Sequence, residues 1–231
     1  FQKTGDGWTQ QAKLTANDGT GGSFFADSIA LSDDLLVSGA DVAPVGVVDA
    51  GVAYVFRRIG TTWTQEAKLI ASNASSGAGF GSGTAIVSED SVVIGAAAAP
   101  SSGLVYFFKR VNGAWLEQSQ LAPSSPEAGQ AFGINIDTSG NSLVVGAYGA
   151  VGIDAFPTGA AYVYRRTGAA WKEEARLVPS ETHIRFFGVR VGISGSTIVA
   201  GAPFTDDFTN PDGGSAWVFQ RSGNTWAMKA R

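Results

Sequence analysis

The sequence predicts an all-β protein made of four tandem copies of one four-stranded unit. Composition is the first reason. Among 231 residues there are 31 glycines and one methionine, and only 16% of the residues are charged. Because glycine favours turns and weakens helices, this composition suits a turn-rich β protein. The second reason is repetition, since tryptophans recur every 52 to 56 residues, at Trp8, Trp63, Trp115, Trp171 and Trp226.

Three further landmarks follow the tryptophans in a fixed order. A phenylalanine is followed by a small residue at Phe25, Phe80, Phe132 and Phe187. A Gly-Ala pair comes 14 or 15 residues later, at Gly39, Gly95, Gly146 and Gly201. An aromatic segment then occupies residues 53–58, 105–110, 161–166 and 216–221. Landmarks that stay in register over four copies indicate a repeat architecture.

Each unit contains four expected strands. The first two, such as 132–137 and 143–147, are apolar and rich in β-branched residues, and a tight turn separates them. The aromatic segment is the third strand. The fourth starts at the tryptophan and contains helix-forming residues, but 63–69 is short and its apolar residues alternate with polar ones, which favours a strand with one wet face.

Four-stranded units at this period predict the blades of a β-propeller, because a parallel β-solenoid has shorter rungs and would not carry a polar fourth strand. We expect one domain over residues 1–231, with repeats at about 8–62, 63–114, 115–170 and 171–225 and a terminal outer strand at 226–231. Five tryptophan-led strands accompany four sets of the other three. This count favours part of a larger ring, such as a seven-bladed one. A closed four-bladed ring and a homo-oligomer that completes one ring are the alternatives.

The run from Phe187-Gly188 to Gly201-Ala202-Pro203 resembles the FG-GAP repeat of integrin α-subunit heads and of many bacterial and fungal surface proteins. The Trp-x-x-x-(Ala/Ser)-x-Leu element resembles the bacterial subtype. The resemblance implies a propeller and an extracellular or cell-surface location. It does not imply one function, since the family includes adhesion receptors, lectins and lipase-associated domains.

Many FG-GAP repeats carry a calcium loop, Asp-x-Asp-x-Asp-Gly-x-x-Asp, between the Phe-Gly strand and the Gly-Ala-Pro strand. The corresponding connections here are 32–34, 88–90, 138–141 and 194–196, and none offers the five or more oxygen ligands that calcium needs. We therefore expect a variant without calcium loops and without a cofactor.

Charge and composition also exclude several partners. The net charge is −4, with 16 basic and 20 acidic side chains, so a nucleic-acid partner is not expected. The absence of cysteine excludes disulfides and cysteine-based metal or redox sites. No apolar run reaches the roughly 18 residues of a membrane span, and the first residues lack the apolar core of a signal peptide.

Loop lengths predict which face binds a ligand. In a propeller, the connections from strand four to strand one and from strand two to strand three emerge on the same face. These connections are long and differ in every copy, whereas those of the opposite face are short and uniform. Variable loops on one face are where binding usually occurs. Our candidate ligand-binding residues are Asp41, Asp49, Tyr148, Asp154, Phe156, His183, Arg190, Phe204 and Phe208.

Several of these candidates have two interpretations. Oxygen ligands at Asp206, Asp207, Asn210 and Asp212 could hold a calcium ion, but Asp, Asn and Gly also stabilise turns, which we favour. The loop aromatic residues beside acids are typical of sugar sites, or they cap the core. Arg190 either lines the central channel and attracts an anion or, as we favour, pairs with a carboxylate such as Asp137.

A non-enzymatic binding or adhesion module for a protein or glycan is the function that we expect. The first alternative is a hydrolase or lyase at the channel mouth, whose structural sign would be a perturbed pair of carboxylates. His183 is the only histidine, and no nucleophile elbow accompanies it, so catalysis through it is not expected. The second alternative is a structural spacer in a large surface protein.

Overall fold

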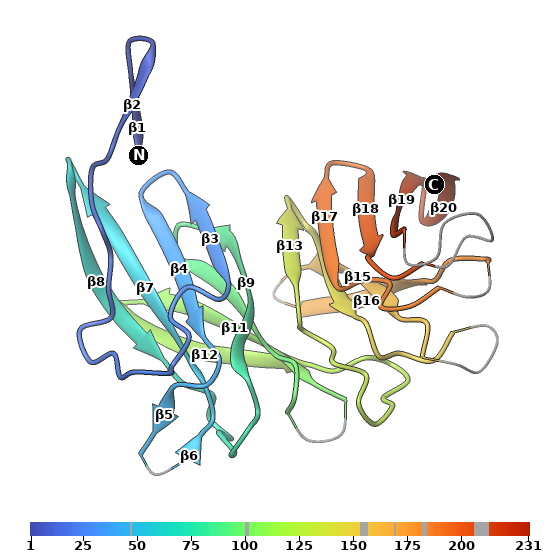
Figure 1. Ribbon diagram of the computed structural model, residues 1–231, viewed down its shortest axis with the longest axis horizontal. Helices are drawn as coiled ribbons and strands as arrows, with labels where there is room; N and C mark the ends of the chain where they lie inside the picture. The colour runs from blue at the N-terminus through green and yellow to red at the C-terminus, as the bar shows by residue number, and fades with distance from the viewer. Residues whose placement is uncertain (47, 100–101, 153–156, 169, 182–183, 206–212) are drawn as a thin grey trace.

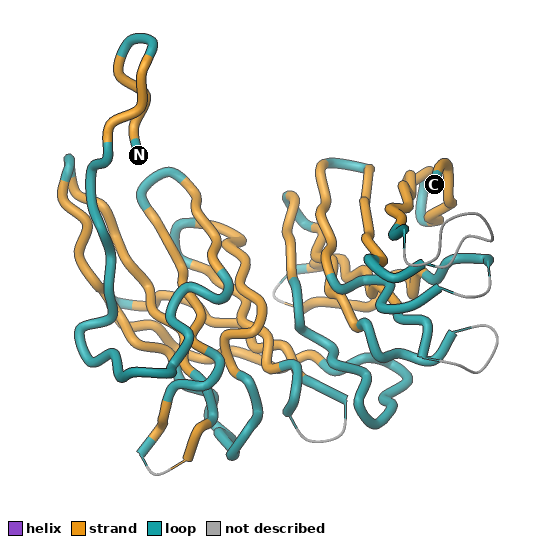
Figure 2. Tube along the Cα trace, in the orientation of Figure 1, coloured by secondary structure: helices purple, strands orange, loops and turns teal. Residues whose placement is uncertain are grey.

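The computed structural model describes residues 1–46, 48–99, 102–152, 157–168, 170–181, 184–205 and 213–231. This part of the chain contains strands and no helix. The strands form four four-stranded antiparallel sheets and two short hairpins (Figures 1 and 2).

Each sheet consists of four strands that pair in chain order. The first sheet contains β3 (Ile29–Ser32), β4 (Leu35–Ala40), β7 (Val52–Ile59) and β8 (Thr62–Leu69). The second contains β9 (Phe80–Ser88), β10 (Ser91–Ala96), β11 (Leu104–Val111) and β12 (Ala114–Leu121). The third contains β13 (Ile136–Ser139), β14 (Ser142–Ala147), β15 (Ala160–Thr167) and β16 (Ala170–Leu177). The fourth contains β17 (Arg190–Ser194), β18 (Thr197–Ala202), β19 (Ser215–Ser222) and β20 (Thr225–Ala230).

The sheets follow one another in an open arc, with the first strand of each on the inside and the tryptophan-led strand on the outside (Figure 1). These are blades of a β-propeller in a ring that is not closed, so the predicted fold class is confirmed. One of the two hairpins, β5 (Pro44–Val45) with β6 (Val48–Asp49), belongs to a long loop of the first sheet. In the other hairpin, β1 (Gln2–Thr4) pairs with β2 (Gly7–Thr9), which carries Trp8. This pairing matches that of the third strand with the tryptophan-led fourth strand in each sheet.

Most of the core lies between the sheets, in three successive seams, and a fourth apolar cluster covers the other face of the first sheet. A valine of each second strand faces the following sheet, and Val37, Val93 and Val144 are all 0% exposed there. The equivalent residue of the fourth sheet, Val199, is 42% exposed because no described sheet covers that face. Burial of these side chains therefore depends on the neighbouring blade.

The sequence landmarks meet at the seams. A side chain on the Gly-Ala glycine of one sheet would overlap the carbonyl group of the Phe-Gly glycine of the next, for the pairs Gly39 with Gly81, Gly95 with Gly133 and Gly146 with Gly188. The phenylalanine amides also donate hydrogen bonds to loop carbonyls of the preceding sheet, from Phe80 to Ala50 (2.9 Å), Phe132 to Ser102 (2.8 Å) and Phe187 to Thr158 (2.9 Å). The two glycines are needed because the backbones touch.

Side chains of β13 and of the residue just before it cover the inner edge of the next sheet. Backbone amides of Val191 and Ile193 donate to Asn135 Oδ1 and Asp137 Oδ2, both at 2.7 Å. Gly195 donates to Ser139 Oγ at 3.0 Å. These bonds satisfy edge groups that would otherwise be open to another strand.

A β-bulge in each outer strand skips the third residue after the tryptophan, which is Glu66, Gln118, Glu174 or Lys229. Because of this bulge, our expectation that one face of the strand holds all of its apolar residues is wrong. Trp63 packs on one side of the first sheet, whereas Ala67 and Leu69 pack in the seam on the other side. A bulge re-aims side chains in this way because two residues oppose one.

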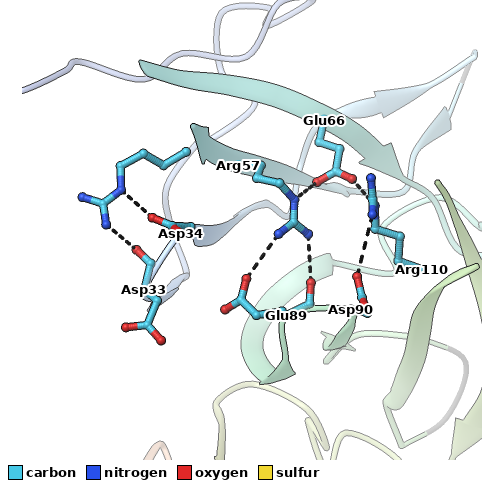
Figure 3. A network of polar contacts seen from close by, with 8 residues as sticks. Asp33, Asp34, Arg57, Glu66, Glu89, Asp90 and Arg110 are labelled. Carbon is cyan, nitrogen blue, oxygen red and sulfur yellow. Dashed lines mark hydrogen bonds and ion pairs between the residues drawn. The ribbon is translucent and has the colours of Figure 1, made fainter. Parts of the chain in front are cut away.

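The bulge also directs an acid across the seam. Glu66 pairs with Arg57 of its own sheet (2.7 Å) and with Arg110 of the next (Figure 3). Glu174 accepts a hydrogen bond from Arg221 Nε of the fourth sheet at 3.1 Å. The middle seam has Gln118 at this position.

Candidate functional site

The described parts of the long connections lie together on one face, as the sequence predicts. Residues 41–51, 97–103, 148–159 and 203–214 join second to third strands, and 70–79, 122–135 and 178–189 join consecutive sheets. The opposite face carries two-residue turns, such as Asp33-Asp34 and Glu89-Asp90. In Figure 1 the long-loop face points downward, where β5 and β6 lie.

A groove of about 620 Å³ crosses the long loops of three consecutive sheets. Candidate residues from different loops meet in it, since Asp41 and Asp49 come from the first sheet and Tyr148 from the third. Between them the walls consist mainly of small residues, which are Ser76, Gly77, Gly79, Ser82, Ala97, Ala98, Ala99, Gly129 and Ala131. Its volume is within the range of small-molecule sites, about 300–1,000 Å³.

Asp41 is the most perturbed acid of this groove. Its Oδ1 atom is buried and has no hydrogen-bond partner among the described residues. Burial raises the pKa of the Asp41 carboxyl, and the negative charge of Asp27 raises it further.

Among the described residues, three aromatic rings form a cluster at the other end of the groove. Tyr148 and Phe186 pack edge to face with centroids 5.3 Å apart, and Phe186 and Phe204 do so at 5.6 Å. Phe186 is 38% and Phe204 47% exposed. Tyr148 lines the groove and also belongs to the cluster, so the groove and the cluster form one continuous surface.

Sequence reasoning identified Tyr148 and Phe204 but missed Phe186. The missed signal was the position before the Phe-Gly pair, where Phe24, Gly79, Ala131 and Phe186 are equivalent. All four have a left-handed backbone, with φ of 53°, 69°, 56° and 59°. A bulky residue in that conformation is unusual and points to a function for its side chain.

Arg190 lines an inner hollow of about 200 Å³ with Asp27, Ser28, Ser82 and Asn135. It has no ion pair with Asp137 within the described residues, contrary to the pairing that we favoured. Asp137 instead accepts bonds from the Thr138 and Ile193 amides, because the sheet edge needs acceptors there. Arg190 Nη1 donates to the Val189 carbonyl at 2.9 Å.

The remaining candidates lie outside the described residues. These are Asp154, Phe156, His183, Phe208 and the four oxygen-bearing residues Asp206, Asp207, Asn210 and Asp212. Within the described ranges, no three His, Asp or Glu residues are grouped as a metal site would require. Two acidic turns where relatives place calcium loops contact arginines instead, since Asp34 pairs with Arg58 at 2.7 Å and Glu89 with Arg57 at 3.2 Å.

Comparison with protein families decides the relationship. The FG-GAP repeat model matches residues 8–56, 63–108, 115–164 and 171–219, which together make up most of the chain. The chain belongs to the FG-GAP repeat family. A comparison with curated protein sequences finds no match. No helix of the described residues could cross a membrane.

Each FG-GAP repeat is out of phase with the sheets. The match at 63–108 starts in β8, the outer strand of the first sheet, and continues through β9, β10 and β11 of the second. One repeat therefore supplies strands to two neighbouring sheets and crosses the seam between them.

Proposed function

We propose that this chain is a non-enzymatic binding or adhesion module that recognises a protein or a glycan through its long-loop face. FG-GAP repeats are typically modules of this kind and are typical of extracellular or surface proteins, so we also propose that location. The observation that carries the proposal is the position of Tyr148, which joins the groove to two exposed aromatic rings from other loops.

Aromatic anchors next to a polar groove are what a binding surface requires. Interface residues that contribute most are enriched in aromatic side chains, and truncating one typically costs about 2 kcal/mol or more. Tyr148, Phe186 and Phe204 belong to none of the three seam clusters, so their side chains are free to serve a ligand.

The test compares Tyr148→Ala with Ile59→Ala, which removes an exposed apolar side chain from the opposite face. The probes are a glycan array and a panel of immobilised extracellular-matrix proteins. We expect Tyr148→Ala to weaken binding by about 30-fold and Ile59→Ala to leave it unchanged. If the unmodified chain binds neither kind of probe, or if both variants weaken binding equally, the proposal is wrong and the spacer alternative is favoured.

A hydrolase or lyase is the second candidate, because the Asp41 pKa is raised by burial and by Asp27. A carboxyl whose pKa is raised beside a second carboxylate is suited to general acid–base catalysis. Release of reducing ends from neutral polysaccharides, or of unsaturated ends from uronic-acid polysaccharides, would show turnover, and Asp41→Asn should abolish it. Binding without turnover would reject this candidate and keep the first.

A further inference from the structure

The backbone at Phe186 is unfavourable for its side chain. Its φ is 59°, in the left-handed region. That conformation costs a residue with a β-carbon free energy that glycine does not incur. The repeats show that the fold accepts smaller residues there, because Gly79 and Ala131 occupy the equivalent positions with φ of 69° and 56°.

The ring of Phe186 is not part of a seam core. Its neighbour Phe187 is fully buried between the third and fourth sheets, whereas Phe186 is 38% exposed. The chain thus keeps an aromatic side chain at a strained position where it contributes little to the core. Strain of this kind persists mainly where function requires it.

The surroundings of Phe186 indicate what it contacts. Tyr148 and Phe204 meet it edge to face, at interplanar angles of 67° and 73°. Phe186 and Phe204 are both more than one third exposed, so part of each ring is open to solvent. An amphipathic ligand with an apolar face could stack on such a surface and continue past Tyr148 into the groove.

The groove lining defines the chemistry of that ligand. It contains two carboxylates, Asp41 and Asp49, and no lysine or arginine among the described residues, which disfavours an anion. Carboxylates are strong acceptors for hydroxyl groups. The walls between Asp49 and Tyr148 are mostly glycine, alanine and serine, so they provide no deep apolar pocket for a protein anchor.

We propose that Phe186 is a ligand-stacking residue for a neutral oligosaccharide that lies along this groove. The sugar places the apolar face of one unit on the aromatic cluster and directs hydroxyls of other units to Asp41 and Asp49. This inference rests on the proposed binding function and assigns to it a ligand class and a residue.

The experiment uses an array of neutral, uronic-acid and amino-sugar oligosaccharides, followed by calorimetric titration with the neutral oligosaccharide that binds best. Phe186→Gly removes the ring and the strain together. Phe24→Gly is the matched control, because Phe24 has the same backbone conformation (φ 53°) and lies outside the groove and the cluster. Phe186→Trp keeps an aromatic face.

We expect neutral oligosaccharides to bind in preference to uronic acids. Phe186→Gly should lose about 30-fold in affinity, with Tm within about 3 °C of the unmodified chain because strain relief offsets the lost ring contacts. Phe24→Gly should bind normally, and Phe186→Trp should recover binding that Phe186→Gly loses.

Each opposite outcome overturns the inference. Binding of uronic acids or amino sugars alone excludes the ligand class, and normal sugar binding by Phe186→Gly excludes the residue. A Tm loss of more than about 10 °C in Phe186→Gly would make the ring structural. Protein binding that Tyr148→Ala abolishes, without sugar binding, would reject this inference and leave the proposed function intact.

Discussion

Gly95 and Gly201 occupy equivalent positions in two sheets, but only Gly95 faces a neighbouring sheet. A β-carbon on Gly95 would lie 2.0 Å from the Gly133 carbonyl oxygen across the seam. Since a carbon–oxygen contact needs about 3.3 Å, the second and third sheets would have to separate by about 1.3 Å. That movement loosens side chains such as Val93 and Phe132, which are now 0% exposed.

Overpacking of this kind costs about 1–3 kcal/mol, and we expect the upper end in Gly95→Ala because the obstacle is backbone. At about 2–4 °C per kcal/mol for a chain of this size, Tm should fall by about 6–12 °C. In Gly201→Ala the nearest atom, the Arg190 carbonyl oxygen, is 3.9 Å from the new carbon. This variant should gain up to about 1 kcal/mol, because glycine weakens a strand.

Calorimetry and urea unfolding of both variants measure the difference. Equal destabilisation by the two substitutions would refute the reasoning, because it would mean that the glycine is needed by its own strand. A silent Gly95→Ala would show that the seam is looser than described.

Three further expectations concern charge. Glu66→Gln should lower the free energy of unfolding by about 1–2 kcal/mol, because it weakens the ion pairs with Arg57 and Arg110. Glu89 is more exposed, so Glu89→Gln should lower it by less than about 0.5 kcal/mol. Urea unfolding measures both values. Burial and the hydrogen bond to Asp18 raise the pKa of Tyr54 to about 12, so its stabilising effect is complete below pH 10 and is lost as pH rises through 12. Ultraviolet titration of tyrosinate should therefore show a late-titrating group that Asp18→Asn shifts to lower pH, and an unchanged titration would contradict this. The Asp41 pKa is raised above 3.8, so the free energy of unfolding should fall as pH rises from 3.8 through the pKa of Asp41 in the folded protein. Asp41→Asn should remove this loss of stability. A variant whose stability has the same pH dependence as the parent would contradict this expectation.

The fold was predictable because the residues that recur in the sequence are the ones that make contacts between the sheets. Gly95 and Gly133 stand in different repeats yet touch across a seam, so their regular spacing reports the geometry of the ring. Trp63 was expected to share a face with Ala67 and Leu69, because the bulge at Glu66 leaves no sign in hydrophobic periodicity. Asp137 was misread for a similar reason, since one of its backbone partners, Ile193, belongs to another sheet.

The candidate site was predictable only in part. Variable loops indicated the face and, within it, Tyr148 and Phe204. Their meeting with Phe186 depends on a left-handed backbone that propensity alone does not suggest for phenylalanine. Comparison of Phe186 with Gly79 and Ala131 in the other repeats could have revealed it.

The groove crosses two seams, because its walls come from loops of the first, second and third sheets. A repeat array unfolds approximately as a sum of units and of the interfaces between neighbours. A ligand held at both Asp49 and Tyr148 would link three blades that otherwise communicate only through adjacent contacts. We therefore expect occupancy to sharpen the unfolding transition as well as delay it, so that the steepness of melting would report whether a bound molecule spans the blades.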